Sequence, residues 1–382
     1  MKEKVAIIDS LGAHGSSFHF YIFGQAKGLS KSGLDVSIYT NNVTNNPNYD
    51  GVKFYQFYKD IFGGKSKLFS GFRYILGSFF SLFHAKFNGV KICHYHIFHV
   101  SILVFFDFIL SKILGLKVVY TIHDVVSFEN SRSRDKLSNW IYKRVNKILT
   151  HNKFSEDIFR RHYKNINTEI DIIPHGNYVP FLKIRKDKIL SRNHLKIPQD
   201  KKVLLFFGMI KKVKGLEILL QAMKEVIEKN SDVFLVIAGR VWKNDFSIYQ
   251  KIIDDNKLSN YCLIHNKFIP HEDVDHYYAS ADLVVLPYTR IYQSGVLMMS
   301  MSYEKAVIVS DLPPLTEVVQ DMKTGFIFES ENPKSLSEKL NQILSDTNKL
   351  EVVRIKGSDH IKSKYDWLEI GKATKKSYQS IL

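Results

Sequence analysis

The sequence has little cysteine and no long apolar run. Its 382 residues include only two cysteines, Cys93 and Cys262, which are far apart and lack metal-ligand spacing. We therefore expect a reducing compartment, with neither a disulfide framework nor a zinc site. No apolar stretch reaches the ~18 residues of a membrane-spanning helix, and the best one, residues 100–110, contains Asp107. The N-terminus lacks the apolar core of a signal peptide, so a cytoplasmic location is predicted.

Acidic residues are also scarce. The chain has 38 Asp and Glu against 54 Lys and Arg, which gives a net charge of +16. Such a charge suits nucleic acid, an anionic membrane surface or a nucleotide-linked substrate. No nucleic-acid-binding module is recognisable, so no nucleic-acid partner is predicted. Residues 59–117 hold eight Lys or Arg but only two acids, interleaved with aromatic and aliphatic residues.

Within this region, one helical stripe is apolar and has basic flanks at Lys65, Lys67, Arg73 and Lys86. The pattern is typical either of a helix lying on an anionic membrane surface or of a core helix with a basic exposed edge. The membrane alternative predicts a peripheral protein at the inner face of the cell membrane. The stripe consists of Leu68, Phe69, Phe72, Ile75, Leu76, Phe79, Phe80 and Phe83.

Two series of alternating strands and helices indicate an α/β fold with two Rossmann-like, doubly wound domains that face a central cleft. We place an N-terminal domain at residues 1–178, a linker at 179–202, a C-terminal domain at 203–364 and a helical tail at 365–382. The linker has two prolines, eight Lys or Arg and no strong periodicity. Strands are expected at residues 5–8, 35–39, 52–57, 90–96, 117–121, 147–151 and 169–173, and then at 203–207, 233–238, 261–264, 283–286, 307–309 and 325–328.

The segment at residues 203–219 carries the clearest chemistry. An apolar run ends at Gly208 and is followed by a short turn with Lys211 and Lys214, and then by a helical pattern. A strand that leads through a glycine turn into a helix is a place where α/β proteins bind anionic ligands. Two lysines there suit a diphosphate that gains charge as it leaves. The alternative is a solvated basic loop.

Ligands of such sheets bind outside the carboxyl ends of the strands, so residues at those ends are candidates for a site. The candidates at these positions are Gly12, Gly15, His96, His123, His175, Gly208, Gly239, Pro287 and Ser310.

Residues 208–223, GMIKKVKGLEILLQAM, resemble the G-x-I-R-x-x-K-G-L-x-x-L segment of the retaining family 4 glycosyltransferases of the GT-B fold. Residues 236–240, 266–288 and 294–328 follow the same family in order and spacing, so the resemblance covers nearly the whole chain. It implies that Lys211, in place of the arginine, and Lys214 hold the donor diphosphate as catalytic residues.

Residues 12–33 resemble the family's acceptor-side glycine loop and first helix, and residues 172–177 resemble the segment that closes the first domain. Residues 120–124, YTIHD, resemble a segment whose histidine reaches the donor sugar, which implies a catalytic role for His123. His94 is expected to be a packing histidine. The acceptor-binding residues implied are Gly12, Gly15, Ser16, His19 and His96.

The resemblance also implies a donor-binding set, for three members of which the residues leave alternatives open. Glu317 either lies near the nucleotide or complements a helix N-terminus. Tyr288 either lines the nucleotide cleft or caps the sheet, and Arg240 meets either a phosphate or an acid. The donor-binding set is Gly208, Lys211, Lys214, Gly239, Arg240, Tyr288, Tyr292, Ser294, Gly295 and Glu317.

The chain departs from the family at two glutamates that normally lie eight positions apart. Aligned on Gly295, these positions hold Tyr292 and Ser300. The first glutamate normally contacts the donor sugar and the second the nucleotide ribose. Glu304, one helical turn after Ser300, is a candidate replacement. A tyrosine hydroxyl donates where a carboxylate only accepts, so the donor sugar is left open.

The resemblance implies transfer of a sugar from a nucleotide-diphosphate sugar, used as co-substrate, to a lipid-linked saccharide in surface polysaccharide biosynthesis, with retention. The two lysines and the N–H groups at Ser294 and Gly295 would stabilise the departing diphosphate, so no metal and no other cofactor is expected. The Asp-Val-Asp at residues 273–275 matches a metal motif but is predicted to be a solvated helix start.

Other outcomes remain open from the sequence. An inverting reaction would need a base, for which His19, His96 and Asp124 are the candidates. A GT-B nucleotide-sugar epimerase and a non-catalytic nucleotide-sugar-binding partner of a synthase complex are the alternative functions.

Overall fold

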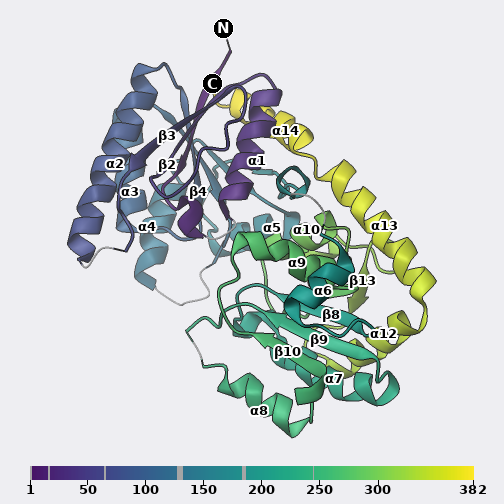
Figure 1. The fold of residues 1–382 in the computed structure, drawn as a ribbon. Helices are drawn as coiled ribbons and strands as arrows, with labels where there is room; N and C mark the ends of the chain where they lie inside the picture. Colours follow the sequence, from purple (N-terminus) through teal and green to yellow (C-terminus); the bar gives the residue numbers. More distant parts are fainter. Residues whose placement is uncertain (1, 16–17, 64–65, 127–131, 183–185, 244) are drawn as a thin grey trace. The chain divides into compact units, whose positions relative to one another are not determined.

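The structure, a computed structural model, describes residues 2–15, 18–63, 66–126, 132–182, 186–243 and 245–382 (Figure 1). The chain divides into two compact units. The N-terminal unit consists of Met1–Gly176 and Tyr365–Leu382, and the C-terminal unit of Asn177–Lys364.

In its described residues, the N-terminal unit has a seven-stranded, fully parallel sheet with the order β3-β2-β1-β4-β5-β6-β7. The order reverses between β1 and β4, which makes their carboxyl ends the switch point of a doubly wound sheet. Nearly every residue of the inner strands is buried, because both faces of the sheet are covered. The strands are β1 (Lys4–Asp9), β2 (Asp35–Asn41), β3 (Val52–Tyr58), β4 (Ile92–Ile97), β5 (Lys117–Ile122), β6 (Lys147–Thr150) and β7 (Ile170–Ile172).

The C-terminal unit repeats this architecture with a six-stranded parallel sheet, counted over its described residues, in the order β10-β9-β8-β11-β12-β13. Its switch point lies between β8 and β11. The strands are β8 (Lys202–Phe207), β9 (Val233–Ala238), β10 (Cys262–His265), β11 (Leu283–Leu286), β12 (Ala306–Ser310) and β13 (Phe326–Phe328). The predicted class of two Rossmann-like α/β domains is therefore confirmed.

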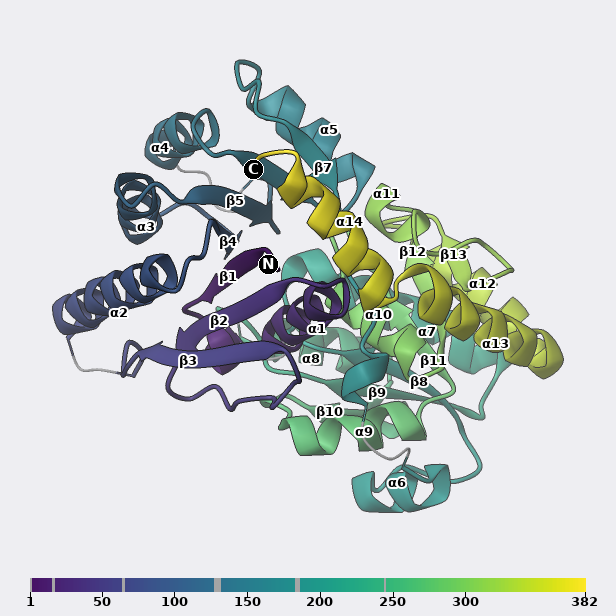
Figure 2. The same cartoon turned by 90° about the horizontal axis from the view of Figure 1, so that it is seen from above.

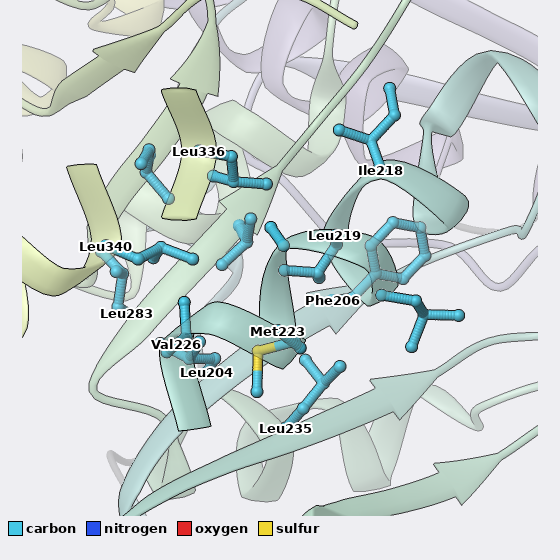
Figure 3. Packing of buried hydrophobic residues seen from close by; sticks show 14 of the residues in the cluster. Leu204, Phe206, Ile218, Leu219, Met223, Val226, Leu235, Leu283, Leu336 and Leu340 are labelled. Carbon is cyan, nitrogen blue, oxygen red and sulfur yellow. The ribbon is translucent and has the colours of Figure 1, made fainter. Parts of the chain in front are cut away.

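The core of the C-terminal unit forms where an amphipathic helix meets this sheet. Helix α7 (Leu216–Lys229) buries Leu219, Met223 and Val226, which pack with Leu204 and Phe206 of β8 (Figure 3). Each fully buried side chain of this size stabilises the fold by about 1.5–3 kcal/mol. This packing fixes the start of α7, and with it the basic turn that precedes the helix.

The helices that connect the strands match the predicted alternation. In the N-terminal unit they are α1 (Phe18–Lys31), α2 (Lys67–Phe87), α3 (Ile102–Ile113), α4 (Arg132–Tyr142) and α5 (Lys153–His162). In the C-terminal unit they are α6 (Lys188–Leu195), α7, α8 (Ser247–Asp255), α9 (His271–Ser280), α10 (Gly295–Ser302), α11 (Pro313–Thr316), α12 (Pro333–Ser345) and α13 (Thr347–Lys364).

The C-terminal residues belong to the N-terminal unit. Sequence analysis set residues 365–382 apart as a tail, whereas α14 (Trp367–Gln379) lies against α1 (Figures 1 and 2). The Ser377 hydroxyl donates to Asp171 over 2.5 Å, and the Lys375 amine donates to the Ser32 carbonyl over 2.9 Å. The tail is thus part of the first domain's packing.

The expected linker also differs from the structure. Residues 188–195 form α6, which packs on α9 in the C-terminal unit. Arg192 is buried there, where its guanidinium pairs with Asp282 over 2.8 Å and donates to the Ser280 carbonyl over 3.1 Å. The basic residues of this segment are thus partly used in packing.

Helix α2 turns its small residues inward and its apolar stripe outward. Gly77, Ser78, Ser81 and Ala85 are buried, which lets the helix lie close to the protein. The stripe is exposed from Leu68 to Phe80, and Phe83 is half-buried. Figure 2 shows α2, α3 and α4 side by side. The core-packed alternative for this stripe is therefore wrong, while Lys65 lies outside the described residues.

Candidate functional site

The basic turn of the C-terminal unit begins directly after β8. Gly208 has φ +105°, and a short 3-10 helix, Lys212–Lys214, follows with Lys211 before it. Gly215 has φ +64°, a left-handed conformation, and α7 begins at the next residue. The predicted strand, glycine turn and helix are thus present.

The turns after β8 and β9 are joined by main-chain hydrogen bonds. The N–H of Ile210 donates to the Arg240 carbonyl over 3.0 Å, and the N–H of Trp242 donates to the Ile210 carbonyl over 2.9 Å. A Cβ on Gly239 would lie 1.9 Å from the Gly208 carbonyl oxygen, so only glycine permits this approach. The carboxyl ends of both strands form one rigid edge.

Each predicted lysine lies over an aromatic ring at this edge. The Lys214 amine is 3.7 Å from the ring centroid of Tyr288, and the Lys211 amine is 5.2 Å from that of Trp242. Such contacts help to hold an ammonium group in place. Tyr288 is buried, and its hydroxyl oxygen has no hydrogen-bond partner in the described part of the chain. The turn therefore presents two positioned cations.

Sequence analysis missed Trp242. Its side chain is 42% exposed, beside Lys211, in the turn after β9. The sequence feature that could have identified it is its position two residues after Arg240, in a loop expected at the same sheet edge. Arg240 is itself exposed, and its carbonyl accepts from Ile210.

Helix α10 begins beside the same edge. The Ser294 hydroxyl caps the helix by accepting from the N–H of Leu297 over 3.1 Å, and Gly295 is the first helical residue. A Cβ on Gly208 would lie 3.3 Å from the Val296 side chain, so the first turn of α10 lies close to the glycine turn. The positive end of the helix dipole is thus near the two lysines.

Tyr292 and Ser300, the positions where the sequence resemblance leads us to expect glutamates, form other contacts. Arg290 donates to the Tyr292 hydroxyl over 3.2 Å, and Tyr292 is buried. Ser300 is buried, and its hydroxyl donates to the Val296 carbonyl over 2.7 Å. Tyr292 thus stands at the position of the first expected glutamate, with Arg290 as its hydrogen-bond donor.

Two sequence hypotheses about acidic residues are wrong. Glu304 does not turn toward Ser300, because its carboxylate pairs with Lys362 and Arg354 of α13 over 2.5 and 3.6 Å. Glu317 follows the last residue of α11, so the alternative of a helix N-terminal acid fails. The exposed Glu317 keeps its predicted donor-side role as a hypothesis.

The Asp-Val-Asp lies on α9, as predicted, but is only partly solvated. Asp273 lies in the first turn, whereas Asp275 is buried and accepts a hydrogen bond from the Tyr303 hydroxyl. Among the described residues, no group of three or more His, Cys, Asp or Glu is arranged to hold a metal ion.

In the N-terminal unit, the glycine loop follows β1. Gly12 has φ +48°, and its N–H donates to the Asp9 carboxylate over 3.0 Å. Gly15 ends the short 3-10 helix Gly12–Gly15, and Ser16 lies outside the described residues. His19 lies on α1, in ring contact with Phe20 and Phe23.

Histidines gather at the carboxyl ends of the three neighbouring strands β4, β5 and β6. Nε2 of His123 is 3.1 Å from Nδ1 of His96, and Nδ1 of His123 is 3.0 Å from Nε2 of His151. His94 is fully buried between Tyr378 and Thr121, as expected of a packing histidine. The structure thus brings His96 and His123 together and adds His151, which sequence analysis missed.

This arrangement constrains the predicted role of His123. Its side chain is 1% exposed, and both ring nitrogens already contact other histidines. A hydrogen bond from this ring to a sugar would require one of those contacts to open. The missed signal was His151 at the end of a predicted strand, one strand away from His123.

Acid is expected to destabilise the N-terminal unit through these histidines. Burial lowers the pKa of His151 to about 4 and those of His94 and His175 to about 3, from 6.5. Below about pH 6.5 these histidines become protonated in the unfolded chain but stay neutral in the folded unit. Each such histidine therefore lowers the free energy of unfolding by up to about 1.4 kcal/mol per pH unit, until its folded pKa is reached.

Asp9 and Asp107 act in the opposite direction, because burial raises their pKa values to about 6 and about 7. The histidines outnumber them, so the melting temperature followed by circular dichroism should fall between about pH 7 and about pH 5. A melting temperature that rises on acidification would contradict this.

Comparison with protein families covers both units. Residues 20–177 match the family model described as Glycosyltransferase Family 4, and residues 187–359 match that described as Glycosyl transferases group 1. Together the two matches leave out only residues 1–19, 178–186 and 360–382.

Two curated relatives match part of the chain. Spore coat protein SA of Bacillus subtilis is 28% identical over 190 residues, which cover 44% of this chain and 46% of that protein. Lipopolysaccharide 1,2-N-acetylglucosaminetransferase of Salmonella typhimurium is 29% identical over 206 residues, which cover 52% and 53%. The chain spans about half the length of these relatives.

Solved structures match the whole chain. The Anabaena protein HepE in complex with UDP-glucose has a TM-score of 0.77 at 16% identity, over 99% of both chains. The likeness shows the GT-B fold, in agreement with the two parallel sheets.

Proposed function

We propose, from the premise that the chain belongs to the glycosyltransferases of the GT-B fold, that it transfers a sugar from a nucleotide-diphosphate sugar to a saccharide acceptor. The observation that carries the proposal is the pair of lysines held over aromatic rings where β8 and β9 end. Two fixed ammonium groups beside a helix N-terminus suit a diphosphate.

The chemistry follows from where charge develops. Breaking the bond between sugar and phosphate leaves negative charge on the β-phosphate, and Lys211 and Lys214 would stabilise it. The N–H groups at the start of α10, near Ser294 and Gly295, would add to this stabilisation. The lysines would take the place of a metal, and the departing diphosphate would accept the acceptor's proton, with retention of configuration.

The donor proposal is a uridine or guanosine diphosphate sugar. HepE, which has the same fold, is in complex with UDP-glucose, which supports the uridine alternative. Tyr292 stands at the position expected to hold a glutamate, with Arg290 bonded to it, so a hydroxyl group instead of a carboxylate would face the sugar. We therefore expect a different preference among the sugar's hydroxyl groups.

The acceptor proposal is a lipid-linked saccharide in surface polysaccharide biosynthesis, bound by the N-terminal unit. The lipopolysaccharide transferase among the relatives supports it. The glycine loop at Gly12 and Gly15, with His19 and His96, would contact the acceptor. No helix in the described ranges is both long and apolar enough to cross a membrane. A peripheral attachment at the inner face of the cell membrane, through the exposed apolar stripe of α2, is a separate part of the proposal.

The exposed stripe of α2 is the surface proposed to meet the membrane. Replacing Phe72 and Phe79 together with serine should reduce co-sedimentation with phosphatidylglycerol vesicles at least about tenfold, because each phenylalanine loses an apolar contact. Both rings are more than two-fifths exposed (58% and 42%), so the melting temperature should stay unchanged.

The matched control is Ile248→Ser on α8, an equally exposed apolar residue of the C-terminal unit. Binding to neutral phosphatidylcholine vesicles should be weak for every variant, since the flanking basic residues need anionic lipid. Undiminished sedimentation of the double variant would overturn the membrane assignment.

The proposal is tested first by thermal stability with UDP, GDP and their sugar conjugates. A ligand at about 100 times its Kd stabilises the folded chain by about 2.7 kcal/mol, so one nucleotide family should raise the melting temperature. The increase should be smaller in Lys211→Ala and Lys214→Ala. Transfer should also persist in excess EDTA, and activity restored only by manganese would refute the metal-free mechanism.

Release of free nucleotide separates the alternatives. A transferase releases it rapidly only when acceptor is present. A nucleotide-sugar epimerase would convert the donor without acceptor, and a non-catalytic partner would bind the nucleotide without either change. The replaced glutamates at Tyr292 and Ser300 are the feature that keeps the non-catalytic partner as the second candidate.

A further inference from the structure

Four side chains of the N-terminal unit form one continuous series of polar contacts. Gln25 Oε1 on α1 lies 2.8 Å from His96 Nε2 at the end of β4. His96 continues to His123 over 3.1 Å, and His123 continues to His151 over 3.0 Å. His151 Nδ1 ends the series 3.0 Å from the carbonyl oxygen of Ile173. Every link is within hydrogen-bond distance.

The Ile173 carbonyl fixes the direction of this series. A carbonyl only accepts, so His151 Nδ1 carries the proton, and in the neutral ring Nε2 is then an acceptor. His123 must therefore donate from Nδ1 and accept at Nε2. His96 must in turn donate from its own Nδ1 and accept at Nε2. One main-chain oxygen thus sets all three tautomers.

Gln25 supplies an independent observation. Its Oε1 lies toward His96, while its buried Nε2 has no hydrogen-bond partner in the described residues. With Oε1 in that place, both ends of the series are acceptors, so His96 Nε2 and His151 Nδ1 must each carry a proton. The two links between the rings need one proton each. Three rings would then hold four protons, so one ring would be an imidazolium. Exchanging the amide oxygen and nitrogen lets Nε2 donate to His96 and keeps every ring neutral.

The surroundings favour the neutral arrangement. Burial lowers the pKa of His151 to about 4 and those of His96 and His123 well below 6.5. Three further titratable groups pack against the series. They are His94, stacked 4.5 Å from His96, His175, 5.7 Å from His151, and Tyr21, 5.3–5.5 Å from each of the three rings. A cation here would be neighboured by further imidazoles.

We infer that His151 is a positioning residue that holds His123 in its Nδ1–H tautomer, within a directional chain that runs from the Gln25 amide to the Ile173 carbonyl. The chain occupies the lone pairs of all three rings, so His96 and His123 are not free to act as a general base. The inference rests on the proposed function only for the location of His123 near the donor sugar.

The test is the imidazole nitrogen NMR spectrum of protein labelled with ¹⁵N-histidine, assigned by single His→Gln variants. At neutral pH the signals of His96, His123 and His151 should all show a protonated Nδ1 and a bare Nε2, with no imidazolium among them. An imidazolium, or His123 protonated at Nε2, would overturn the inference.

Two variants test the direction of the chain. His151→Phe removes the acceptor for His123 Nδ1–H, so both His123 and His96 should switch to the Nε2–H tautomer, with His96 then donating to Gln25 Oε1. Gln25→Leu leaves the Ile173 carbonyl in control, so His123 should stay Nδ1–H. His175 is a buried histidine outside the chain, so His175→Gln is the matched control and should leave the tautomers of His123 and His96 unchanged.

The outcomes separate this inference from the proposed function. Circular dichroism first shows that each variant is folded. If the tautomers are as expected but no nucleotide raises the melting temperature, the transferase proposal fails while the chain stands. If nucleotide binds but His151→Phe leaves His123 as Nδ1–H, the positioning role fails alone. Should His151→Phe not fold, His151→Leu provides the same readout.

Discussion

Lys214→Ala is expected to lower the rate of sugar transfer by about 10²–10³-fold, the loss seen when one donor to a developing oxyanion is removed. The Lys214 amine is held 3.7 Å from the Tyr288 ring centroid, in a turn fixed by main-chain hydrogen bonds. The charge it faces grows as the bond to the diphosphate breaks, so kcat should fall more than KM rises. Lys211→Ala should behave alike, and initial rates over a range of donor concentrations separate the two effects.

The same turn offers a matched control. Lys212 lies between the two lysines and is exposed, so Lys212→Ala should keep nearly full activity. All three variants should show the circular dichroism spectrum and melting temperature of the native chain. If Lys214→Ala or Lys211→Ala turned over normally, the assignment of the diphosphate to this turn would be abandoned.

Gly215→Ala is expected to lower the free energy of unfolding by about 2–4 kcal/mol, the sum of a left-handed backbone and an overpacked contact. Gly215 has φ +64°, and a Cβ there would lie 1.8 Å from the Pro287 carbonyl oxygen. That oxygen belongs to the main chain directly after β11, so it cannot swing aside as a flexible side chain would. Urea unfolding followed by circular dichroism measures the change.

Gly71→Ala provides the comparison, because a Cβ at Gly71 meets nothing within 4 Å. On helix α2 this change should be neutral or should stabilise by up to about 1 kcal/mol, since alanine is the better helix former. Equal urea midpoints for Gly215→Ala and the native chain would show that the turn relaxes easily and does not hold Lys214 rigidly.

The candidate donor turn could be anticipated because its signals are local. The apolar run, Gly208, the two lysines and the helical period are contiguous in the sequence, and the structure has each in its expected place. The ring beneath Lys211 was not anticipated, since Trp242 comes from the loop after another strand. Glu304 was misplaced for the same reason, because its partners Lys362 and Arg354 lie on α13, far along the chain.

The sequence by itself determined the α/β class, the alternation of elements and the position of each strand, because apolar runs and helical periods are short-range patterns. It also determined that α2 has an apolar stripe. Only the tertiary structure decided that this stripe faces solvent, because periodicity shows that a helix has two faces but not which one the protein covers.

Tertiary structure also decided which residues the C-terminal helix and the histidines contact. α14 joins the first unit through contacts with residues more than 200 positions away, such as Asp171. His96, His123 and His151 come together because parallel strands bring their carboxyl ends to one edge, and Gln25 joins them from helix α1. Contacts of this kind depend on strand order and side-chain packing, which no local pattern of residues specifies.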